Sequence, residues 1–297
     1  MITLELKDLK TVEKQNWLQH AIAPRPIAFA STIDKAGNIN LSPFSFFNMF
    51  SSNPPVIIFS PARRLRDNTT KHTLQNIEEV PEVVIHICDY DMVQQISLAS
   101  CEFPKSVDEF VKTGFNKQPA FHVKPPMVKE AKVKLECKVL EIKTLGNEGG
   151  AGNLVIAEVI CMHVDENILN TDHSMIDQRK LHQVARLGGN WYSVVNEHNL
   201  FQVPKPNVQL GIGVDVLPES IRNSNILTGN NLGMLANVHE LPVIDAAFED
   251  DKLKNIFQYY SLAPDDMEKE LHIYAKELLD AGKVQEAWQV LLSGTSL

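Results

Sequence analysis

The sequence has few cysteines, and none of them is spaced as a covalent or metal-binding pair. Four occur among the 297 residues, at Cys88, Cys101, Cys137 and Cys161. No C-x-x-C pair is present, which argues against a disulfide framework and against a zinc clip. Cys137 and Cys161 fall on apolar positions of predicted strands, so we expect buried or incidental thiols there.

Long hydrophobic runs are also missing. No stretch approaches the roughly 20 apolar residues of a membrane span. The first ten residues alternate charged and apolar side chains and do not form the apolar core of a signal peptide. The hydrophobic fraction of 44% and the charged fraction of 22% are those of a folded globular chain. We therefore predict a cytoplasmic protein with no membrane contact.

Positive charge is scarce, and the formal net charge is −9. The densest basic stretch, residues 63–71, contains four basic side chains but is interrupted by Asp67 and Asn68. It is too short and too broken to neutralise several phosphates in a row, so we do not expect nucleic acid as a partner. Such a stretch suits one small anion, and a solvated loop is the alternative interpretation.

Several common catalytic fingerprints are absent from the sequence. No G-x-G-x-x-G opens a helix after a strand, and there is no phosphate loop, H-E-x-x-H or G-x-S-x-G motif. The usual forms of a Rossmann site, a kinase, a zinc protease and a serine hydrolase lose their support. His86 and His163 lie on predicted strands without further ligands at a known spacing. We expect structural histidines there and predict no metal site.

What the sequence does contain, over its first two thirds, is short β-branched runs separated by turn residues. Residues 133–139 alternate apolar and charged side chains with period two, which is typical of a half-buried strand. The other predicted strands are 27–33, 56–59, 83–88 and 154–164, and the predicted helical segments are 8–20, 73–80, 91–100 and a short turn at 108–113. The fold class predicted is mainly β, a β-barrel with peripheral helices.

The strand pattern ends near residue 205, and we place a domain boundary there, between 1–204 and 205–297. The second part is predicted to be loop-rich at first and then helical. Its last segment, with helices at 271–279 and 284–292, is a helical hairpin. It is similar to a single tetratricopeptide unit, but no second copy is present, and a plain hairpin that packs on other elements is the favoured interpretation.

Ordered motifs between residues 20 and 195 resemble the flavin reductase-like family with an FMN-binding split barrel. They read APRPIAFASTID at 23–34, NLSPFSFFN at 40–48, SNPP at 52–55, KHTLQNI at 71–77, DEF at 108–110, LEC at 135–137 and ARLGGNWY at 185–192. Each motif alone is weak, and their common order and spacing make the resemblance specific. In most relatives the helix-opening motif reads Lys-Asp-Thr, and here His72 replaces the middle carboxylate.

The resemblance implies that FMN lies at the barrel surface near a homodimer interface. A helix N-terminus at Thr73 suits the phosphate, because its free N–H groups favour an anion. The residues expected to contact the cofactor are Ser31, Thr32, Ser45, Phe46, Phe47 and Asn48 at the ring, Ser60, Arg66, Lys71 and Thr73 at the phosphate, and Arg25, Arg186 and Tyr192 nearby. Ordinary core packing is the alternative role for the phenylalanines.

The function implied is an FMN-dependent oxidoreductase of the NAD(P)H:flavin reductase type, with a protein acceptor such as a monooxygenase downstream. No catalytic side chain is predicted, since the flavin carries the chemistry. Two alternatives remain open: a flavoredoxin-like electron-transfer protein that keeps its FMN, and a non-catalytic FMN-binding scaffold whose C-terminal extension recruits a partner.

Overall fold

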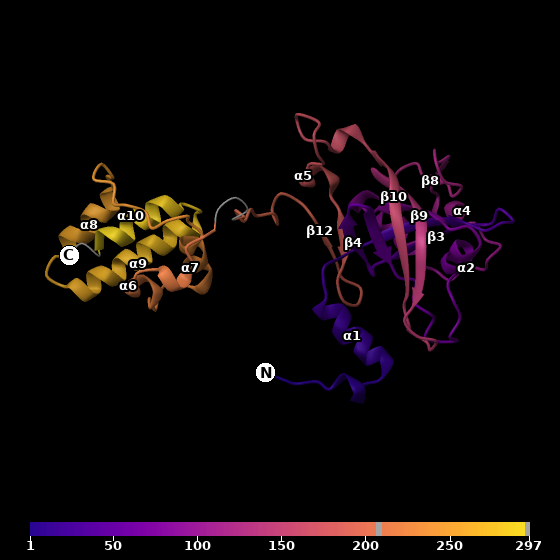
Figure 1. Ribbon diagram of the computed structural model, residues 1–297, viewed down its shortest axis with the longest axis horizontal. Coiled ribbons are helices and arrows are strands. Elements are labelled where there is room, and N and C mark those ends of the chain that lie inside the picture. The colour runs from indigo at the N-terminus through magenta and orange to yellow at the C-terminus, as the bar shows by residue number, and fades with distance from the viewer. Residues whose placement is uncertain (206–209, 295–297) are drawn as a thin grey trace. The chain divides into compact units, whose positions relative to one another are not determined.

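A computed structural model describes residues 1–205 and 210–294 of the chain. Contacts divide the chain into two compact units, Met1–Phe201 and Gln202–Leu297. All labelled strands belong to the first unit, and helices α6 to α10 form the second (Figure 1). Each unit has a hydrophobic core of its own.

The first unit is built on a seven-stranded sheet in the order β3-β2-β6-β9-β10-β5-β4. All neighbouring strands in this sheet are antiparallel. The strands are β2 (Ala28–Ile33), β3 (Ile39–Phe44), β4 (Phe47–Ser52), β5 (Pro55–Phe59), β6 (Glu82–Ile87), β9 (Val133–Thr144) and β10 (Asn153–Val164). The smaller sheets are β1 (Arg25–Pro26), β11 (Val184–Arg186) and β12 (Tyr192–Val194), and β7 (Lys117–Gln118) with β8 (Met127–Val128).

Strand β2 is buried on both faces, which explains its continuous apolar sequence. Its side chains alternate between two cores because successive residues of a strand point to opposite faces. Ala28 and Ala30 pack in the core inside the curved sheet, whereas Phe29 packs in a second core with Phe110 and Phe115. The strand therefore has no solvent face, and its neighbours β3 and β6 satisfy its main-chain groups.

Peripheral helices surround this sheet, as the sequence predicts, with differences at their ends. The predicted segment 8–20 is a short 3-10 turn and then α1, because the extended residues Leu9 and Lys10 interrupt it. The predicted segment 91–100 is a 3-10 turn that leads directly into α3. The helical elements are η1 (Leu6–Asp8), α1 (Thr11–Ala21), α2 (His72–Glu79), η2 (Tyr90–Met92), α3 (Val93–Leu98), α4 (Glu109–Thr113), η3 (Glu166–Ile168) and α5 (Gln178–Leu181).

The second unit is helical and ends in the predicted helical hairpin. Helices α9 and α10 pack together, and Gly282 takes a positive φ of 76° in the turn between them. Trp288 is fully buried in the core of this unit. The helical elements are η4 (Val214–Val216), α6 (Glu219–Arg222), α7 (Gly229–Ala236), α8 (Asp251–Tyr259), α9 (Pro264–Asp280) and α10 (Val284–Gly294). Across the described residues of both units, we find no helix with the length and apolar character needed to cross a bilayer.

His86 links three strands in the first unit through its imidazole ring. Nδ1 donates to the carbonyl oxygen of Phe29 at 2.7 Å, and Nε2 accepts the N–H of Val128 at 2.8 Å. The ring is fully buried, and this burial lowers the pKa of His86 to about 3. The structural role predicted for this histidine agrees with these contacts.

The buried neutral imidazole should make the first unit sensitive to acid. An unfolded histidine takes up a proton below its ordinary pKa of about 6.5, whereas folded His86 does not until about pH 3. Folding stability therefore falls by about 1.4 kcal/mol for each pH unit as pH decreases within this window. Urea unfolding of the wild type and of His86→Gln between pH 7 and pH 5 checks this. We expect a shallower pH slope in the variant, and equal slopes would contradict the assignment.

Candidate functional site

A cleft of about 710 Å³ lies between α1 and the loop that precedes α2. Gln15, Leu18 and Gln19 line it from α1, and Phe46 and Lys71 line the other side. A smaller hollow of about 200 Å³ shares Gln15, Gln19, Phe46 and Lys71 with it. The two together are called the α1 cleft.

Three basic side chains of the α1 cleft converge on one carboxylate, that of Glu102. The distances to its oxygens are 3.0 Å from Arg64 Nε, 2.9 Å from Arg66 Nη2 and 3.5 Å from Lys71 Nζ. Burial on its own raises the pKa of Glu102, but Lys71 and Arg64 lower it overall. Since Arg66 also pairs with Asp67, three cations face two carboxylates, and the group keeps a positive surplus.

The N-terminus of α2 adjoins the basic cluster, because Lys71 belongs to both. Lys71 is its N-cap residue, no side chain caps the first N–H groups, and the first turn contains no acidic residue. Free N–H groups and the helix dipole therefore add to the positive potential of the cleft. An anion with two or three oxygens fits this combination of donors.

Thr73, predicted to contact a phosphate, is buried in the first turn of α2. Its hydroxyl donates to Oδ1 of Asn40, whose amide donates in turn to Oε1 of buried Glu109 at 2.9 Å. Thr73 lines a small hollow together with Lys71. In this structure its hydroxyl hydrogen holds the start of α2 and does not point to the α1 cleft as a donor.

Ser60 lines the smaller hollow and is almost fully buried. Its Oγ has no hydrogen-bond partner among the described residues. The backbone approaches closely here, since a Cβ at Gly152 would lie 2.7 Å from this oxygen. A buried hydroxyl without a partner is unusual and points to a ligand that supplies one.

Four of the six predicted ring-binding residues, at positions 45–48, divide into two pairs. Ser45 and Phe46 line the α1 cleft, and 42% of the surface of Phe46 is exposed. Phe47 packs partly on the inner core, and Asn48 is exposed with its Oδ1 accepting the N–H of Met49. Only the first pair is positioned to meet a ligand in the cleft.

Ser31 and Thr32 are fully buried in β2 and line neither hollow of the α1 cleft. Thr32 Oγ1 accepts a hydrogen bond from the amide of Asn76 at 3.2 Å. Ser31 Oγ has no partner among the described residues. Both lie on the strand that is covered on its two faces, and this separates them from the α1 cleft.

Of the three remaining predicted residues, Arg25 lines the α1 cleft, and Arg186 and Tyr192 lie outside it. Arg25 lines the cleft, but its guanidinium donates to the carbonyl oxygens of Gln19, Ile22 and Leu187, tying the end of α1 to β11. Burial, together with Arg186, lowers the pKa of Arg25.

Arg186 and Tyr192 form a pair of their own. Arg186 donates to the hydroxyl of Tyr192 at 2.7 Å, and its guanidinium lies 4.6 Å from the ring centroid. Both line a separate hollow of about 380 Å³. They do not line the α1 cleft.

Sequence reasoning missed Glu102 and the α1 side chains of the cleft. Residues 11–22 had no motif to mark them, and the apolar residues of α1 do not gather on one face of the helix, so its sequence predicts no contact. Arg64 belongs to the basic stretch predicted to suit a small anion, and the structure places it in the cleft. Gly150, from the turn between β9 and β10, also lines the cleft.

Comparisons with known proteins agree on one family. The model of the family "Flavin reductase like domain" matches residues 20–185. An uncharacterized protein of Halalkalibacterium halodurans is 34% identical over 202 residues, which are 67% of this chain and 94% of the relative. The uncharacterized protein YwrF of Bacillus subtilis is 31% identical over 199 residues, 66% of this chain and 96% of the relative.

Solved structures show the same relationship. Nitrilotriacetate monooxygenase component B from Bacillus cereus matches with a TM-score of 0.64 and 28% identity, covering 68% of this chain and 98% of its own. A flavin reductase with a split barrel domain from Shewanella frigidimarina matches with a TM-score of 0.57 and 25% identity, covering 67% and 96%. The predicted split-barrel fold is confirmed, and the chain belongs to the flavin reductase-like family, with a C-terminal helical unit beyond the matched residues.

Proposed function

We propose that the chain binds FMN in the α1 cleft and works as an FMN-dependent oxidoreductase of the NAD(P)H:flavin reductase type. The observation that carries this proposal is one cleft that combines a basic cluster, an uncapped helix N-terminus, an aromatic side chain and a buried hydroxyl without a partner. Family membership supports a flavin as the ligand.

The residues of the α1 cleft fit FMN in charge and shape. A phosphate monoester carries between one and two negative charges at neutral pH and offers three acceptor oxygens. Arg64, Arg66 and Lys71 supply the opposite charge, and Ser60 supplies a hydroxyl without a competing partner. The side chains of Phe46 and Leu18 give apolar surface to a planar ring.

When bound, the flavin supplies the redox chemistry by accepting a hydride from a reduced nicotinamide and passing electrons to an acceptor. The protein binds and orients it. Lys71 and the first turn of α2 hold the phosphate end, which leaves the ring end beside Phe46 and α1. The half-exposed face of Phe46 keeps this end of the cleft open to a second molecule.

The partners proposed are a nicotinamide as reductant and a protein such as a monooxygenase as acceptor. The second is supported by the similar structure of a monooxygenase component B. A homodimer is supported by strand β4, which is a sheet edge and exposes Met49 and Phe50. Analytical ultracentrifugation tests the dimer, and cell fractionation tests the cytoplasmic location predicted from the sequence.

We also propose that residues 1–204 form the flavin domain and 205–297 a separate extension. The division of the chain into compact units between Phe201 and Gln202 supports this, as does a family match that ends at residue 185. A fragment of residues 1–204 should bind FMN as the full chain does. Loss of binding in a folded fragment would contradict the proposal.

Absorbance tests the proposed activity. Added FMN should give a shifted flavin spectrum with the purified protein, and NADH or NADPH without oxygen should bleach it. Steady oxidation of the nicotinamide in the presence of free flavin supports the reductase. Bound flavin that neither nicotinamide reduces supports the flavoredoxin-like alternative, and a protein that ignores FMN contradicts both.

Ser60→Ala should have opposite effects on the free protein and on FMN binding. Removing a buried hydroxyl that has no partner leaves the stability of the free protein unchanged or slightly higher, whereas loss of a hydrogen bond to the charged phosphate weakens FMN about tenfold. Thermal unfolding and a fluorescence titration measure the two effects. An unchanged FMN affinity would show that Ser60 does not contact the ligand.

A further inference from the structure

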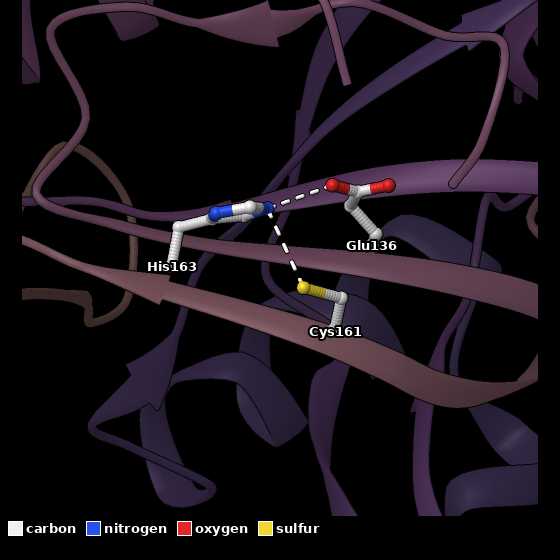
Figure 2. Close-up of side chains that lie close together, drawn as sticks. All are labelled: Glu136, Cys161 and His163. Atoms are coloured by element: carbon white, nitrogen blue, oxygen red, sulfur yellow. Dashed lines mark hydrogen bonds and ion pairs between the residues drawn. The ribbon is translucent and has the colours of Figure 1, made fainter. Parts of the chain in front are cut away.

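A second cluster of reactive side chains lies on the two long strands β9 and β10, away from the residues that line the α1 cleft. Cys161 pairs with Glu136 across the strands, and His163 follows two residues later on the same face of β10. Figure 2 shows the three side chains pointing toward one another. His163 Nε2 lies 2.7 Å from Glu136 Oε1 and 3.7 Å from Cys161 Sγ, and the three ligand atoms all lie within 4.8 Å of one another.

Glu136 is held in place before any ligand arrives. Its carboxylate is fully buried and accepts the backbone N–H groups of Phe121 at 2.9 Å, His122 at 2.6 Å and Val123 at 3.2 Å. Ligating carboxylates in metal sites are oriented by hydrogen bonds of this kind.

His163 is oriented as well, and its side chain is partly exposed. The ring of Phe121 meets it edge-on with 4.9 Å between the centroids. The His163 side chain is 21% exposed, and Cys161 is half-buried. Solvent therefore reaches the side chains of both His163 and Cys161.

We propose that Glu136, Cys161 and His163 bind one Zn²⁺ ion, with the fourth position open to water. A thiolate, an imidazole nitrogen and a carboxylate oxygen are the ligand types zinc prefers. Zinc bonds of about 2.3 Å to sulfur and about 2.0 Å to nitrogen place these atoms roughly 3.6 Å apart at a tetrahedral angle. The sulfur–nitrogen distance of 3.7 Å in the structure agrees with this.

The contact between His163 and Glu136 accommodates the ion with one small movement, and the charges balance. The Nε2–Oε1 distance has to open from 2.7 Å to roughly 3.3 Å for zinc bonds of about 2 Å, and the exposed edge of His163 allows it. Zn²⁺ then replaces the proton between Nε2 and Oε1, so Glu136 keeps all its N–H donors. The charges of the thiolate and the carboxylate together neutralise the ion.

The sequence does not reveal this site, because the ligands are not spaced as any zinc motif. Cys161 and His163 are two residues apart on a strand, and Glu136 joins them only through the register of β9 against β10. The prediction of an incidental Cys161 and a structural His163 came from local sequence alone. The hydrogen bond from His163 to Glu136 fits that role, but it does not explain why Cys161 Sγ faces the same nitrogen.

Cobalt substitution tests the proposal, since Co²⁺ bound to a thiolate has a charge-transfer band in the near ultraviolet. The full-length protein is stripped with a chelator and titrated with Co²⁺. We expect a band that saturates at one ion per chain, is lost in Cys161→Ser, and persists in the matched control Cys101→Ser, whose exposed thiol lies outside the cluster. No band in the wild type, or a band that survives Cys161→Ser, overturns the proposal.

Protection from alkylation is a second readout that needs no variant of the cluster. Zn²⁺ should slow the reaction of Cys161 with iodoacetamide at least tenfold, while exposed Cys101 in the same sample reacts at an unchanged rate. Peptide mass spectrometry follows both sites. Equal alkylation of Cys161 with and without Zn²⁺ overturns the proposal, and neither experiment depends on flavin binding.

Discussion

Lys71→Met should lower the affinity for FMN by about 10- to 100-fold and leave the affinity for riboflavin unchanged. Lys71 is the residue at the N-cap position of α2, and its side chain lines both hollows of the α1 cleft. A charge-assisted hydrogen bond contributes about 1.5–3 kcal/mol, and each 1.4 kcal/mol is about tenfold in affinity. Riboflavin has the same ring but no phosphate, so it does not sense the ammonium group.

Flavin fluorescence titrations at fixed ionic strength measure both affinities. The matched control is Lys124→Met, because Lys124 is exposed and lines neither hollow of the α1 cleft. The control should bind both flavins as the wild type does. If Lys71→Met weakens FMN and riboflavin equally, Lys71 acts through the structure of the cleft and the phosphate lies elsewhere.

Glu102→Gln should raise the affinity for FMN about tenfold. The carboxylate of Glu102 occupies the basic cluster of Arg64, Arg66 and Lys71 that we assign to the phosphate. The phosphate has to displace or repel this negative charge, whereas the neutral amide removes the repulsion and keeps the size. Because Lys71 and Arg64 lower the pKa of Glu102, the wild-type carboxylate is ionised at neutral pH.

The direction of the Glu102 effect makes the test sharp, since loss of a purely structural ion pair would not tighten binding. The control is Glu141→Gln, which removes an exposed carboxylate on β9 that lines neither hollow of the α1 cleft. Riboflavin again serves as the ligand without a phosphate. A Glu102→Gln variant that binds FMN as weakly as the wild type, or more weakly, would contradict a phosphate at this cluster.

Much of the fold could be predicted because its signals are local. The alternation of residues 133–139 identified β9, but the strand continues to Thr144, where both faces become more exposed. The β-branched runs identified β5, β6 and β10 within a residue or so of their ends. The two halves of the helical hairpin were also visible from their apolar spacing and from Gly282 in the turn.

The candidate site was harder to predict because it depends on contacts between distant segments. Lys71 and Arg66 belong to a recognisable motif region, and the structure brings them together in the α1 cleft. Ser31 lies in an equally recognisable motif but is covered on both faces of β2. Glu102 reaches the cluster from the loop after α3, and no pattern in the sequence connects it with Arg64.

The cluster on β9 and β10 shows the same limit of local patterns. Glu136 and Cys161 are brought opposite each other by strand register, which includes a shift between Val159 and Cys161. An irregularity of this kind re-aims side chains and is not encoded by the alternation of apolar and polar residues. Three ligand atoms could therefore meet without any zinc motif in the sequence.

A crystal structure of the full-length protein with FMN tests the central claim most directly. We predict one FMN per chain in the α1 cleft, with its phosphate contacting Lys71 and the first N–H groups of α2, a hydrogen bond to Ser60, and the ring beside Phe46. Glu102 should have moved away from Arg64 and Lys71. Flavin bound outside the α1 cleft, or a cleft that stays empty at saturating FMN, would contradict the account.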